Sequence, residues 1–378
     1  MSEIASRVVV AMSGGVDSSV AAALLVERGY DVLGMMMRLW SDEALGGPAH
    51  NRCCTPQQMS DARRIADQLG IPFYVLDTKD VFRNRVVQYF IDGHRDGFTP
   101  NPCLQCNRHV RFDWLLKNAL ALDADYLATG HYARIDQDRS GKYRLRGGVD
   151  IGKDQSYVLS VMGQSQLART LFPVGEFSKQ EVRALARKFG LNVEGKQDSQ
   201  DLCFLGGQDY RDFLRLHAPD LMQPGPIVRK NGERLGEHQG LSNYTIGQRR
   251  GLGLSYDVPL YVLEMKPADN SLVVGTGEEL GRDDLLADSV NWVSGESPAR
   301  PLRAGVKIRY QARPQPAMVE PIGKDQIYVR FDLPQRDITP GQAAVIYDGD
   351  VCLGGGVIRK FEEIERARGR PEAELISN

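Results

Sequence analysis

Short apolar runs alternate with helix-like stretches through residues 1–135. The apolar runs predict four strands, at Val8–Met12, Val32–Trp40, Phe73–Asp77 and Tyr126–Tyr132. The stretches between them predict four helices, at about 16–28, 56–69, 80–95 and 111–121. This alternation predicts an α/β fold with a doubly wound parallel sheet, in which ligands bind beyond the carboxyl ends of the strands. Ser13–Ser18, Met37 and Gly130-His131 are therefore expected around one crevice.

Two helices carry explicit start signals. Thr55–Gln58 has the residues of a capping box with a proline in the first turn, and Gly70 is placed to end that helix. Ser178–Glu181 is a second capping box and opens a helix predicted at Gln180–Lys188. These signals fix helix boundaries more closely than periodicity does.

From about residue 136 the pattern changes. A hairpin is predicted at Arg134–Arg146 and a short helix at 209–217, and Asn231-Gly232 predicts a second hairpin with a type I′ turn. After about residue 280 the helical period disappears, and short strands at Val306–Tyr310, Ile327–Phe331 and Ala343–Tyr347 predict an antiparallel β-barrel. In the first of them Val306, Ile308 and Tyr310 alternate with Lys307 and Arg309, so the two sets are expected on opposite faces. The expected units are an α/β domain at 1–205, a small central domain at 206–278, a barrel at 279–362 and a flexible tail at 363–378.

Composition indicates an ordinary soluble protein. The 378 residues are 42% hydrophobic and 25% charged, and the net charge of −2 argues against a protein that coats nucleic acid through bulk charge. No apolar run approaches the roughly 18–20 residues that span a membrane, and the first residues lack the layout of a signal peptide. Six cysteines are too few for a disulfide scaffold, so a cytoplasmic location is expected.

A glycine-rich segment directly follows the first predicted strand. Residues 13–18 read Ser-Gly-Gly-Val-Asp-Ser. Gly14 and Gly15 let the backbone approach an anion closely, and the N–H groups at the start of the next helix supply partial positive charge. The lysine-containing Walker A pattern is absent. The segment resembles the PP-loop of ATP pyrophosphatases, which cleave ATP between the α and β phosphates; the alternative is an ordinary glycine-rich turn.

Three cysteines stand where chemistry is expected. Cys103 and Cys106 form a Cys-x-x-Cys pair among prolines that predict an extended loop before the helix at 111–121, and Cys203 lies in a polar turn. A thiolate near a helix N-terminus is stabilised, and the thiolate is the reactive form. Cys352 alternates with apolar residues in a strand, which predicts a position in the core.

Two interpretations of these cysteines are open. In the first, Cys103 and Cys106 are half of a structural zinc site that Cys53, Cys54 and Cys203 could complete in space. The other is sulfur transfer, in which one cysteine carries a persulfide and a second releases its outer sulfur as a disulfide forms. A thioredoxin-like pair is disfavoured because the motif does not open a helix directly after a strand.

Taken in chain order, several motifs resemble the tRNA-specific 2-thiouridylases, which thiolate the wobble uridine of certain tRNAs. Besides the loop at residues 13–18, they are the Thr-Pro-Asn-Pro-x-x-x-Cys-Asn segment at 99–107, Ala128–Tyr132, Lys153–Tyr157, Cys203-Phe204, Gly236–Gly240, Gly247–Gly253, Thr339–Gln342 and Cys352–Gly356. The resemblance extends from about residue 5 to residue 360.

The resemblance implies a PP-loop catalytic domain, a central domain and a C-terminal barrel that act on tRNA with ATP and Mg²⁺. It also implies a sulfur-donor protein that delivers the sulfur. Uridine O2 would be adenylated, and sulfur would then attack C2 and release AMP. Cys203 matches the persulfide carrier, and Cys106 matches the nucleophile that ends in a disulfide with it. The positions matching ATP-binding residues are Ala11, Met12, Ser13, Gly14, Gly15, Val16, Asp17, Ser18, Met37 and Gly130. Those matching tRNA-binding residues are Asn101, Pro102, Cys103, His131, Lys153, Asp154, Gln155, Arg309, Tyr310 and Gln342.

Cys103 departs from the pattern, because many members of this family have aspartate there. A carboxylate could act as a base or orienter, which a thiol does less well. With Cys106 and Cys203, Cys103 makes a third catalytic candidate, and the three could instead hold a [4Fe–4S] cluster with an open site for sulfide. The persulfide relay and the cluster are both kept as hypotheses.

Other readings of the motifs are also open. Asp17 either organises Mg²⁺ and phosphate or is an acid that favours the helix dipole. His131 alone is also typical of a structural histidine, and Arg249-Arg250 and Arg309 are also typical of solvated turns and strands. The rival functions are another PP-loop enzyme, such as an amide-forming or lysidine-type ligase, and a non-catalytic RNA-binding module.

Overall fold

The computed structural model describes residues 5–41, 55–193, 195–196, 202–361 and 363. Its first domain is built on a parallel five-stranded sheet in the order β3-β2-β1-β4-β7. The strands are β1 (Arg7–Ala11), β2 (Asp31–Arg38), β3 (Phe73–Asp77), β4 (Tyr126–Thr129) and β7 (Thr170–Leu171). The predicted α/β fold with a parallel sheet is confirmed, with strand ends that differ from the predicted ones by up to three residues.

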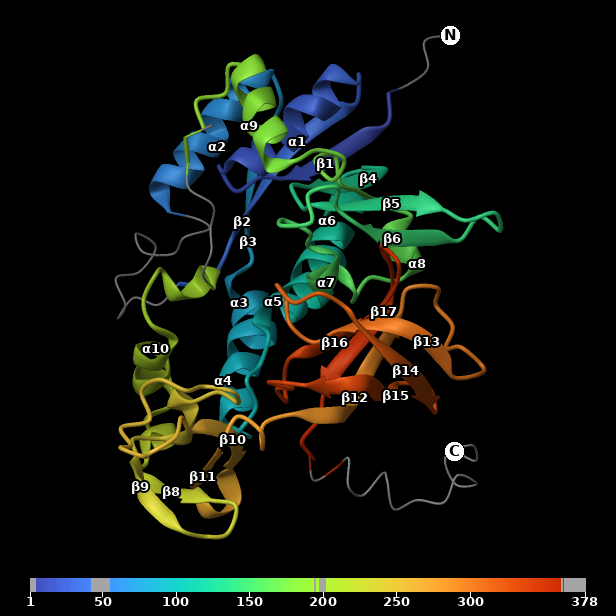
Figure 1. The fold of residues 1–378 in the computed structure, drawn as a ribbon. Coiled ribbons are helices and arrows are strands. Elements are labelled where there is room, and N and C mark those ends of the chain that lie inside the picture. The colour runs from blue at the N-terminus through green and yellow to red at the C-terminus, as the bar shows by residue number, and fades with distance from the viewer. Residues whose placement is uncertain (1–4, 42–54, 194, 197–201, 362, 364–378) are drawn as a thin grey trace.

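Helices cover both faces of this sheet (Figure 1). On one face lie α1 (Val16–Glu27), α2 (Pro56–Leu69) and α9 (Lys179–Lys188), whose apolar side chains share a core with the strands. The capping boxes of α2 and α9 are formed as predicted, and Gly70 ends α2 with φ of +67°. The signals read from the sequence therefore locate these two helices closely.

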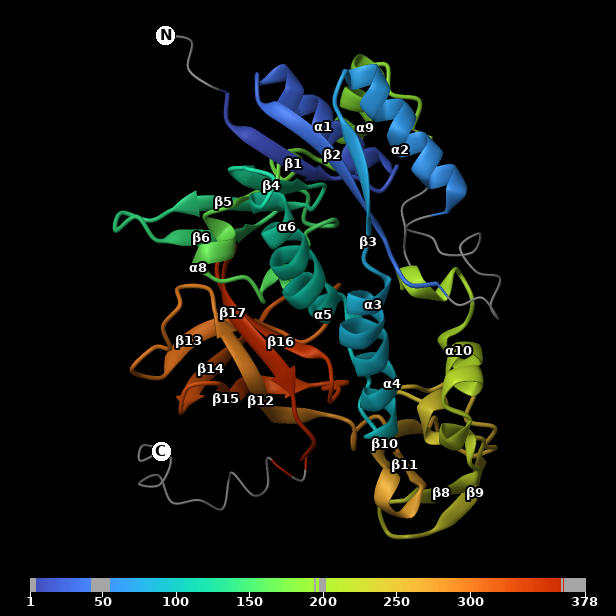
Figure 2. The same cartoon turned by 180° about the vertical axis from the view of Figure 1, so that it is seen from behind.

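Two longer helices lie between the parallel sheet and the other two domains, as the reverse view shows (Figure 2). One consists of α3 (Lys79–Phe82), a π-helical stretch at Arg83–Val87 and α4 (Gln88–Arg95). The other runs without a break from residue 102 to 120 through α5 (Pro102–Gln105), a π-helical stretch at Cys106–Leu115 and α6 (Leu116–Leu120). The second helix begins nine residues earlier than predicted, which changes the setting of the cysteines.

A small central domain follows α10 (Tyr210–His217). Its sheet has the order β10-β11-β8-β9. Its strands are β8 (Gly225–Arg229), β9 (Arg234–His238), β10 (Tyr261–Lys266) and β11 (Ser271–Gly275). The hairpin expected at Asn231-Gly232 is present, but the turn is not type I′, because Gly232 has a positive φ and Asn231 does not.

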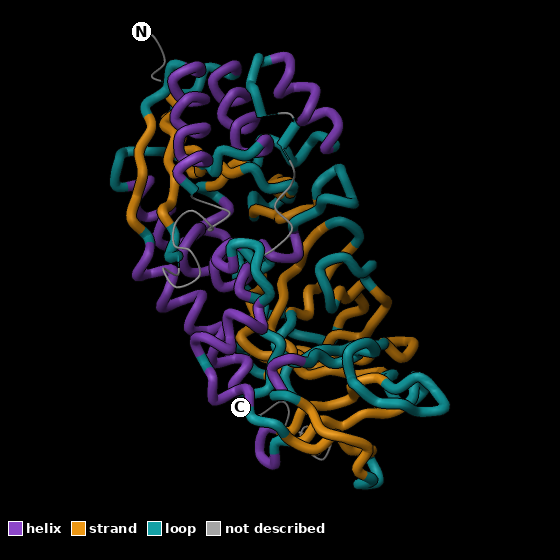
Figure 3. Tube along the Cα trace, turned by 90° about the vertical axis from the view of Figure 1, so that its left-hand side faces the viewer, coloured by secondary structure: helices purple, strands orange, loops and turns teal. Residues whose placement is uncertain are grey.

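The C-terminal strands close into a six-stranded antiparallel barrel through the pairing of β12 with β17. Its strands are β12 (Arg282–Trp292), β13 (Leu302–Lys307), β14 (Gln315–Ile322), β15 (Gln326–Gln335), β16 (Ala343–Asp348) and β17 (Val351–Ile358). The hairpin of β5 (Ala133–Gln137) and β6 (Tyr143–Gly147) extends this sheet by pairing β6 with β17. Helices and the strands of the parallel sheet lie at the end of the molecule that carries the N-terminus, further helices extend along one side, and barrel strands lie at the other end (Figure 3).

One predicted strand is wrong in a way that matters. β13 ends at Lys307, so Arg309 and Tyr310 lie in the turn after it rather than on alternating faces. Lys307 is buried together with Val306 and Ile308, and its ammonium lies 5.8 Å from the ring centroid of Tyr310. No helix in the described part of the chain combines the length and the apolar character needed to cross a membrane.

Candidate active site

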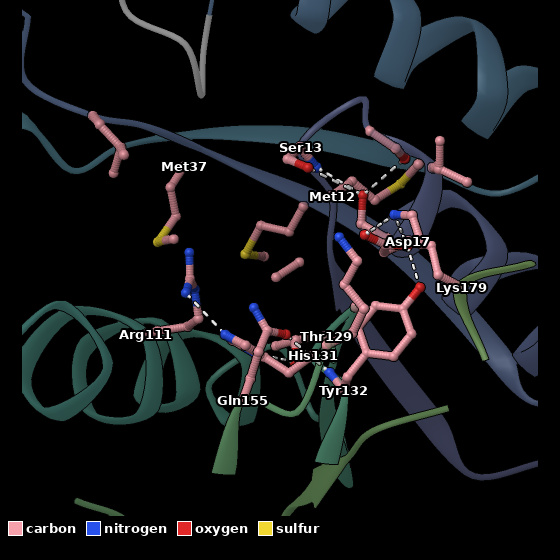
Figure 4. A pocket seen from close by; sticks show the side chains of 18 of the residues that line it. Met12, Ser13, Asp17, Met37, Arg111, Thr129, His131, Tyr132, Gln155 and Lys179 are labelled. Atoms are coloured by element: carbon pink, nitrogen blue, oxygen red, sulfur yellow. Dashed lines mark hydrogen bonds and ion pairs between the residues drawn. The ribbon is translucent and has the colours of Figure 1, made fainter. Parts of the chain in front are cut away.

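A cavity of about 340 Å³ lies beyond the carboxyl ends of β1, β2 and β4 (Figure 4). Every predicted ATP-binding residue lines it except Gly14. Four predicted tRNA-binding residues also line it: His131, Lys153, Gln155 and Tyr310. Tyr310 comes from the C-terminal barrel, so two domains form this cavity. Its remaining lining residues are Met35, Leu39, Arg111, Thr129, Tyr132 and Lys179.

The loop at residues 13–18 has the backbone that a phosphate site needs. Ser18 accepts a hydrogen bond from the Ser13 N–H at 3.1 Å and so closes the turn in front of α1. A Cβ on Gly14, at φ of +70°, would lie 2.4 Å from the carbonyl oxygen of Gln58. A Cβ on Gly130 would lie 2.6 Å from the Ser18 nitrogen. Glycine is therefore needed at both positions, because backbone segments approach each other closely there.

Lys179 brings a positive charge to this loop that the sequence motif does not contain. Its ammonium donates to both carboxylate oxygens of Asp17, at 2.8 and 2.9 Å, and the Tyr132 hydroxyl donates to Asp17 at 2.7 Å. Lys179 occupies the first turn of α9, directly after the N-cap Ser178. The capping box was visible in the sequence, but nothing there showed that this helix start faces the loop.

A second lysine holds the loop from the other side. The Lys196 ammonium donates to the Gly14 carbonyl at 2.7 Å and forms an ion pair with the buried Asp61 of α2. Burial acts to raise the pKa of Asp61, but Lys196, Gln57 and Arg64 together outweigh it and leave that pKa below the ordinary value. Lys196 therefore links the Gly14 carbonyl to the buried carboxylate of Asp61 in α2.

His131 forms part of the cavity wall in a neutral state. Its Nδ1 lies 2.7 Å from Thr129 Oγ1, and its Nε2 lies 3.3 Å from a guanidinium nitrogen of Arg111. Because a guanidinium only donates, Nε2 accepts and the ring proton resides on Nδ1. Burial, together with the charge of Arg111, lowers the pKa of His131 well below its ordinary value. His131 is thus a neutral part of the cavity wall.

Cys103 and Cys106 lie in the first turns of a helix, not in an extended loop as predicted. Asn101 is the N-cap, and its side chain accepts a hydrogen bond from the Cys103 N–H at 3.1 Å, while Pro102 begins the helix. Asparagine followed by proline is a start signal that the sequence contained and that was overlooked. The helix follows α4 rather than a strand, so the setting still differs from a thioredoxin-like pair.

Cys106 and Cys203 pack into one hydrophobic cluster. Cys106 is buried and Cys203 half-buried there, and Met37 and Leu39 of the cavity wall belong to the same cluster. Cys352 is 1% exposed, and burial raises its pKa to about 12, which agrees with the predicted core position.

Cys103 has different surroundings. It is exposed. Burial chiefly raises the pKa of Tyr310, and Asp154 and Cys103 contribute to the same shift. Among the described residues no three Cys, His, Asp or Glu side chains gather so that they could hold a metal ion. A [4Fe–4S] cluster on Cys103, Cys106 and Cys203 therefore does not fit this arrangement, and Cys53-Cys54, invoked for a zinc site, lie outside the described residues.

Several predicted tRNA-binding residues have partners inside the protein. Asp154 accepts hydrogen bonds from the Gly148 and Ser156 N–H groups, at 3.2 and 3.0 Å. Gln342 donates to the Thr99 carbonyl at 2.8 Å. Arg309 forms an ion pair with Asp337 and stays 44% exposed. Asn101, Pro102 and Cys103 form the start of a helix and are not among the residues that line the cavity.

Family models match three consecutive parts of the chain. They are a tRNA methyl transferase HUP domain at residues 6–207, a tRNA methyl transferase PRC-barrel domain at 211–276 and an aminomethyltransferase β-barrel domain at 282–358. A tRNA-specific 2-thiouridylase MnmA of Carboxydothermus hydrogenoformans is 49% identical over 356 residues, 94% of this chain and 98% of that protein. The chain belongs to the tRNA-specific 2-thiouridylase family.

Other relatives in this 2-thiouridylase family match at similar coverage. The MnmA of Clostridioides difficile is 45% identical over 359 residues, covering 94% of this chain and 98% of that protein. The MnmA of Roseiflexus castenholzii is 48% identical and covered completely. A solved complex of a 4-thiouridine synthetase with RNA and bound ATP has 17% identity and a TM-score of 0.31, covering 57% of this chain and 51% of that one. That score is too low to establish a common fold.

Proposed function

We propose that this protein catalyses ATP-dependent 2-thiolation of the wobble uridine in tRNA. One observation carries the proposal: Met37 and Leu39 line the phosphate-loop cavity and also pack in the cluster that holds Cys106 and Cys203. A nucleotide site and two thiols thus share one wall. Another PP-loop ligase would have no use for this pair of thiols. The names of the curated relatives agree with thiolation of tRNA.

The first step is activation of the base. Uridine O2 attacks the α-phosphorus of ATP, the N3 proton leaves, and pyrophosphate departs toward the loop at residues 13–18. The loop N–H groups and Lys179 are placed to stabilise the negative charge that develops there. AMP is a far better leaving group from C2 than hydroxide, so the adenylated base is open to attack by sulfur.

The second step is transfer of sulfur. The Cys106 thiolate attacks the inner sulfur of a Cys203 persulfide, a disulfide forms between the two residues, and the outer sulfur leaves as hydrosulfide. Hydrosulfide attacks C2 and displaces AMP, and its proton ends on N3 of the 2-thiouridine. A thiol reductant then supplies two electrons to open the disulfide, and a sulfur-donor protein reloads Cys203. We expect the reaction to take place in the cytoplasm, where thiol reductants are present.

Magnesium and Cys103 have narrower roles in this proposal. Asp17 is the only carboxylate that lines the cavity in the described part of the chain, so a magnesium ion would be held chiefly by the phosphates of ATP. Cys103 lies in the first turn of the helix that carries Cys106 and contributes to the raised pKa of Tyr310, so we assign it to contact with the target base. We assign catalysis to the domain at 1–205 and tRNA binding also to the barrel at 279–362.

The test is the product of the nucleotide reaction. We expect α-labelled ATP, unmodified tRNA and a sulfur donor to give AMP and pyrophosphate. Cys106→Ser and Cys203→Ser should stop formation of 2-thiouridine and release of AMP, while pyrophosphate is still released and the labelled AMP stays on the tRNA. Cys352→Ser is the matched control, since it changes a cysteine outside this site and should retain activity. Accumulation of ADP instead of AMP, or full thiolation by Cys203→Ser with a protein donor, would overturn the proposal.

A further inference from the structure

The turn between β15 and β16 holds the chain directly in front of the cysteine helix. The Thr99 N–H donates to the Pro340 carbonyl at 2.9 Å, and the Gln342 side-chain amide donates to the Thr99 carbonyl at 2.8 Å. Both backbone groups of Thr99 are thus paired with one turn of the barrel, 243 residues away from Gln342 in sequence. This is a two-point attachment of a catalytic-domain segment to another domain.

The turn itself is fixed within the barrel. The Gly341 N–H donates to the Ile358 carbonyl at 2.9 Å, and the Ile358 N–H donates to the Gln342 carbonyl at 2.8 Å. Gly341 has φ of +92°, and a Cβ there would lie 2.9 Å from the carbonyl oxygen of Thr99. A side chain at 341 would therefore be strained and would also push against Thr99. The barrel presents the Gln342 amide from a rigid support.

Little slack separates Thr99 from the cysteines. Pro100 is buried, and a Cβ on Gly93 of α4 would lie 2.9 Å from its ring, so the proline is held against that helix. Asn101 follows directly and caps the helix through the Cys103 N–H. Because both prolines in this segment have a fixed φ, the position of Thr99 determines where the helix begins.

The geometry points to Gln342 as a positioning residue, whose amide fixes Thr99 and thereby the helix start that carries Cys103 and Cys106. The inference rests on the proposed function for the role of Cys106 as nucleophile. It assigns the Gln342 amide to the protein itself, where the resemblance had suggested a contact with tRNA. The barrel then positions the helix that carries the cysteines even before tRNA binds.

The experiment compares Gln342→Met with wild type in the absence of tRNA and ATP. Methionine keeps the length and volume of glutamine but donates no hydrogen bond. Hydrogen exchange of the segment 98–106 and alkylation of Cys106, both read by mass spectrometry, should accelerate about three- to tenfold, the effect expected for one lost hydrogen bond. Exchange of β10 and β11 in the same sample gives the reference for global stability.

Gln315→Met is the matched control, because Gln315 also donates from the barrel to a carbonyl, that of Arg313 two residues away, and leaves Thr99 untouched. It should change neither readout. Gly341→Ala, which pushes on Thr99 from the same turn, should accelerate both. In thiolation assays Gln342→Met should lower kcat and leave the Kd for tRNA unchanged.

Unchanged exchange and alkylation would overturn the inference, and a lower tRNA affinity in that case would make Gln342 a tRNA contact. Acceleration of equal size in β10 and β11 would also overturn it, because the effect would then be a general loss of stability. Exchange and alkylation need no turnover, so they decide the role of Gln342 even if the wild-type protein were to form no 2-thiouridine. The inference and the proposed function can therefore fail separately.

Discussion

Lys179 supplies the cavity with the cation that the glycine-rich motif lacks. Its side chain is only 11% exposed, and its ammonium is held by Asp17 at the start of α1. An anion that enters the cavity therefore meets a positive charge that is already largely desolvated and oriented. Electrostatic interactions formed in such a setting are stronger than at an exposed site.

We expect Lys179→Met to weaken ATP binding by roughly tenfold or more, the effect of losing one charge-assisted hydrogen bond. Lys188→Met is the control, since Lys188 lies on the same helix and forms an ion pair with Glu27 of α1 far from the cavity. Calorimetric titration with ATP measures both. Equal affinities for the two variants would show that Lys179 only stabilises the packing of α9 on α1.

His94 makes the stability of the protein depend on pH. It is buried in α4 between the rings of Phe90 and Tyr210, and burial lowers its pKa to about 4. The unfolded chain takes up this proton near pH 6.5, so the contribution of His94 is present above that pH and is lost as the pH falls toward 4. Between pH 7 and pH 5 the loss is about 2 kcal/mol.

The variant His94→Gln does not titrate, so its free energy of unfolding should fall by about 2 kcal/mol less than that of wild type between these pH values. Urea unfolding at pH 7 and pH 5 measures the difference. An identical fall in the two proteins would mean that His94 is protonated in the folded state at pH 5.

The sequence predicts the residues around the cavity where one local motif contains them. Gly14, Asp17 and Gly130 belong to segments whose order along the chain and position at strand ends are visible in the pattern. Lys179 is 162 residues away from Asp17, and only the packing of α9 on α1 brings the two together. A single sequence carries no signal for such a pair, beyond the capping box that places Lys179 in a first turn.

Among the elements, the helix from 102 to 120 differs most from expectation. Proline favours extended structure before it, which suggested a loop, but proline also suits the first turn of a helix. Asn101 decides between the two because its side chain caps the helix. In β13 the alternation of Val306, Lys307 and Ile308 suggested opposite faces, but the strand ends at Lys307 and all three are buried.

The cap of this helix should matter for the cysteines. We expect Asn101→Ala to destabilise the first turn by about 1 kcal/mol and to accelerate hydrogen exchange at residues 103–106, while Asn101→Asp should keep the cap. Ser178→Ala, which removes the N-cap of α9, is the control and should leave residues 103–106 unaffected. If Asn101→Ala changes exchange no more than Asn101→Asp does, Pro102 alone holds the helix start.

In the whole molecule, the α/β domain, the central domain and the barrel are joined more closely than their sequence patterns suggest. The β5–β6 hairpin of the first domain adds to the barrel sheet by pairing with β17. A Cβ on Gly247 of the central domain would lie 2.1 Å from Asp337, in the same connection that holds Thr99. The strand pattern could predict a barrel, but not these contacts, because each joins segments that are far apart in the chain.

Arg309 tests whether the barrel contributes to tRNA binding. It stands in the turn after β13, beside Tyr310 of the cavity wall, and its guanidinium is partly exposed although it pairs with Asp337. A contact from Arg309 to one phosphate would release counterions, so Arg309→Ala should weaken binding and reduce the slope of log K against log salt by about one. Filter binding of unmodified tRNA across a salt series measures both.

Arg303→Ala is the matched control for this series. Arg303 lies on β13 itself and is also exposed and paired with an aspartate, Asp332, but it is not next to the cavity. If Arg309 binds a phosphate, only its own variant changes the slope, and AMP formation with saturating tRNA persists in both variants. The same affinity and slope for both variants would instead mean that tRNA is held by the first two domains and that Arg309 only secures Asp337 in the connection leading to Gln342.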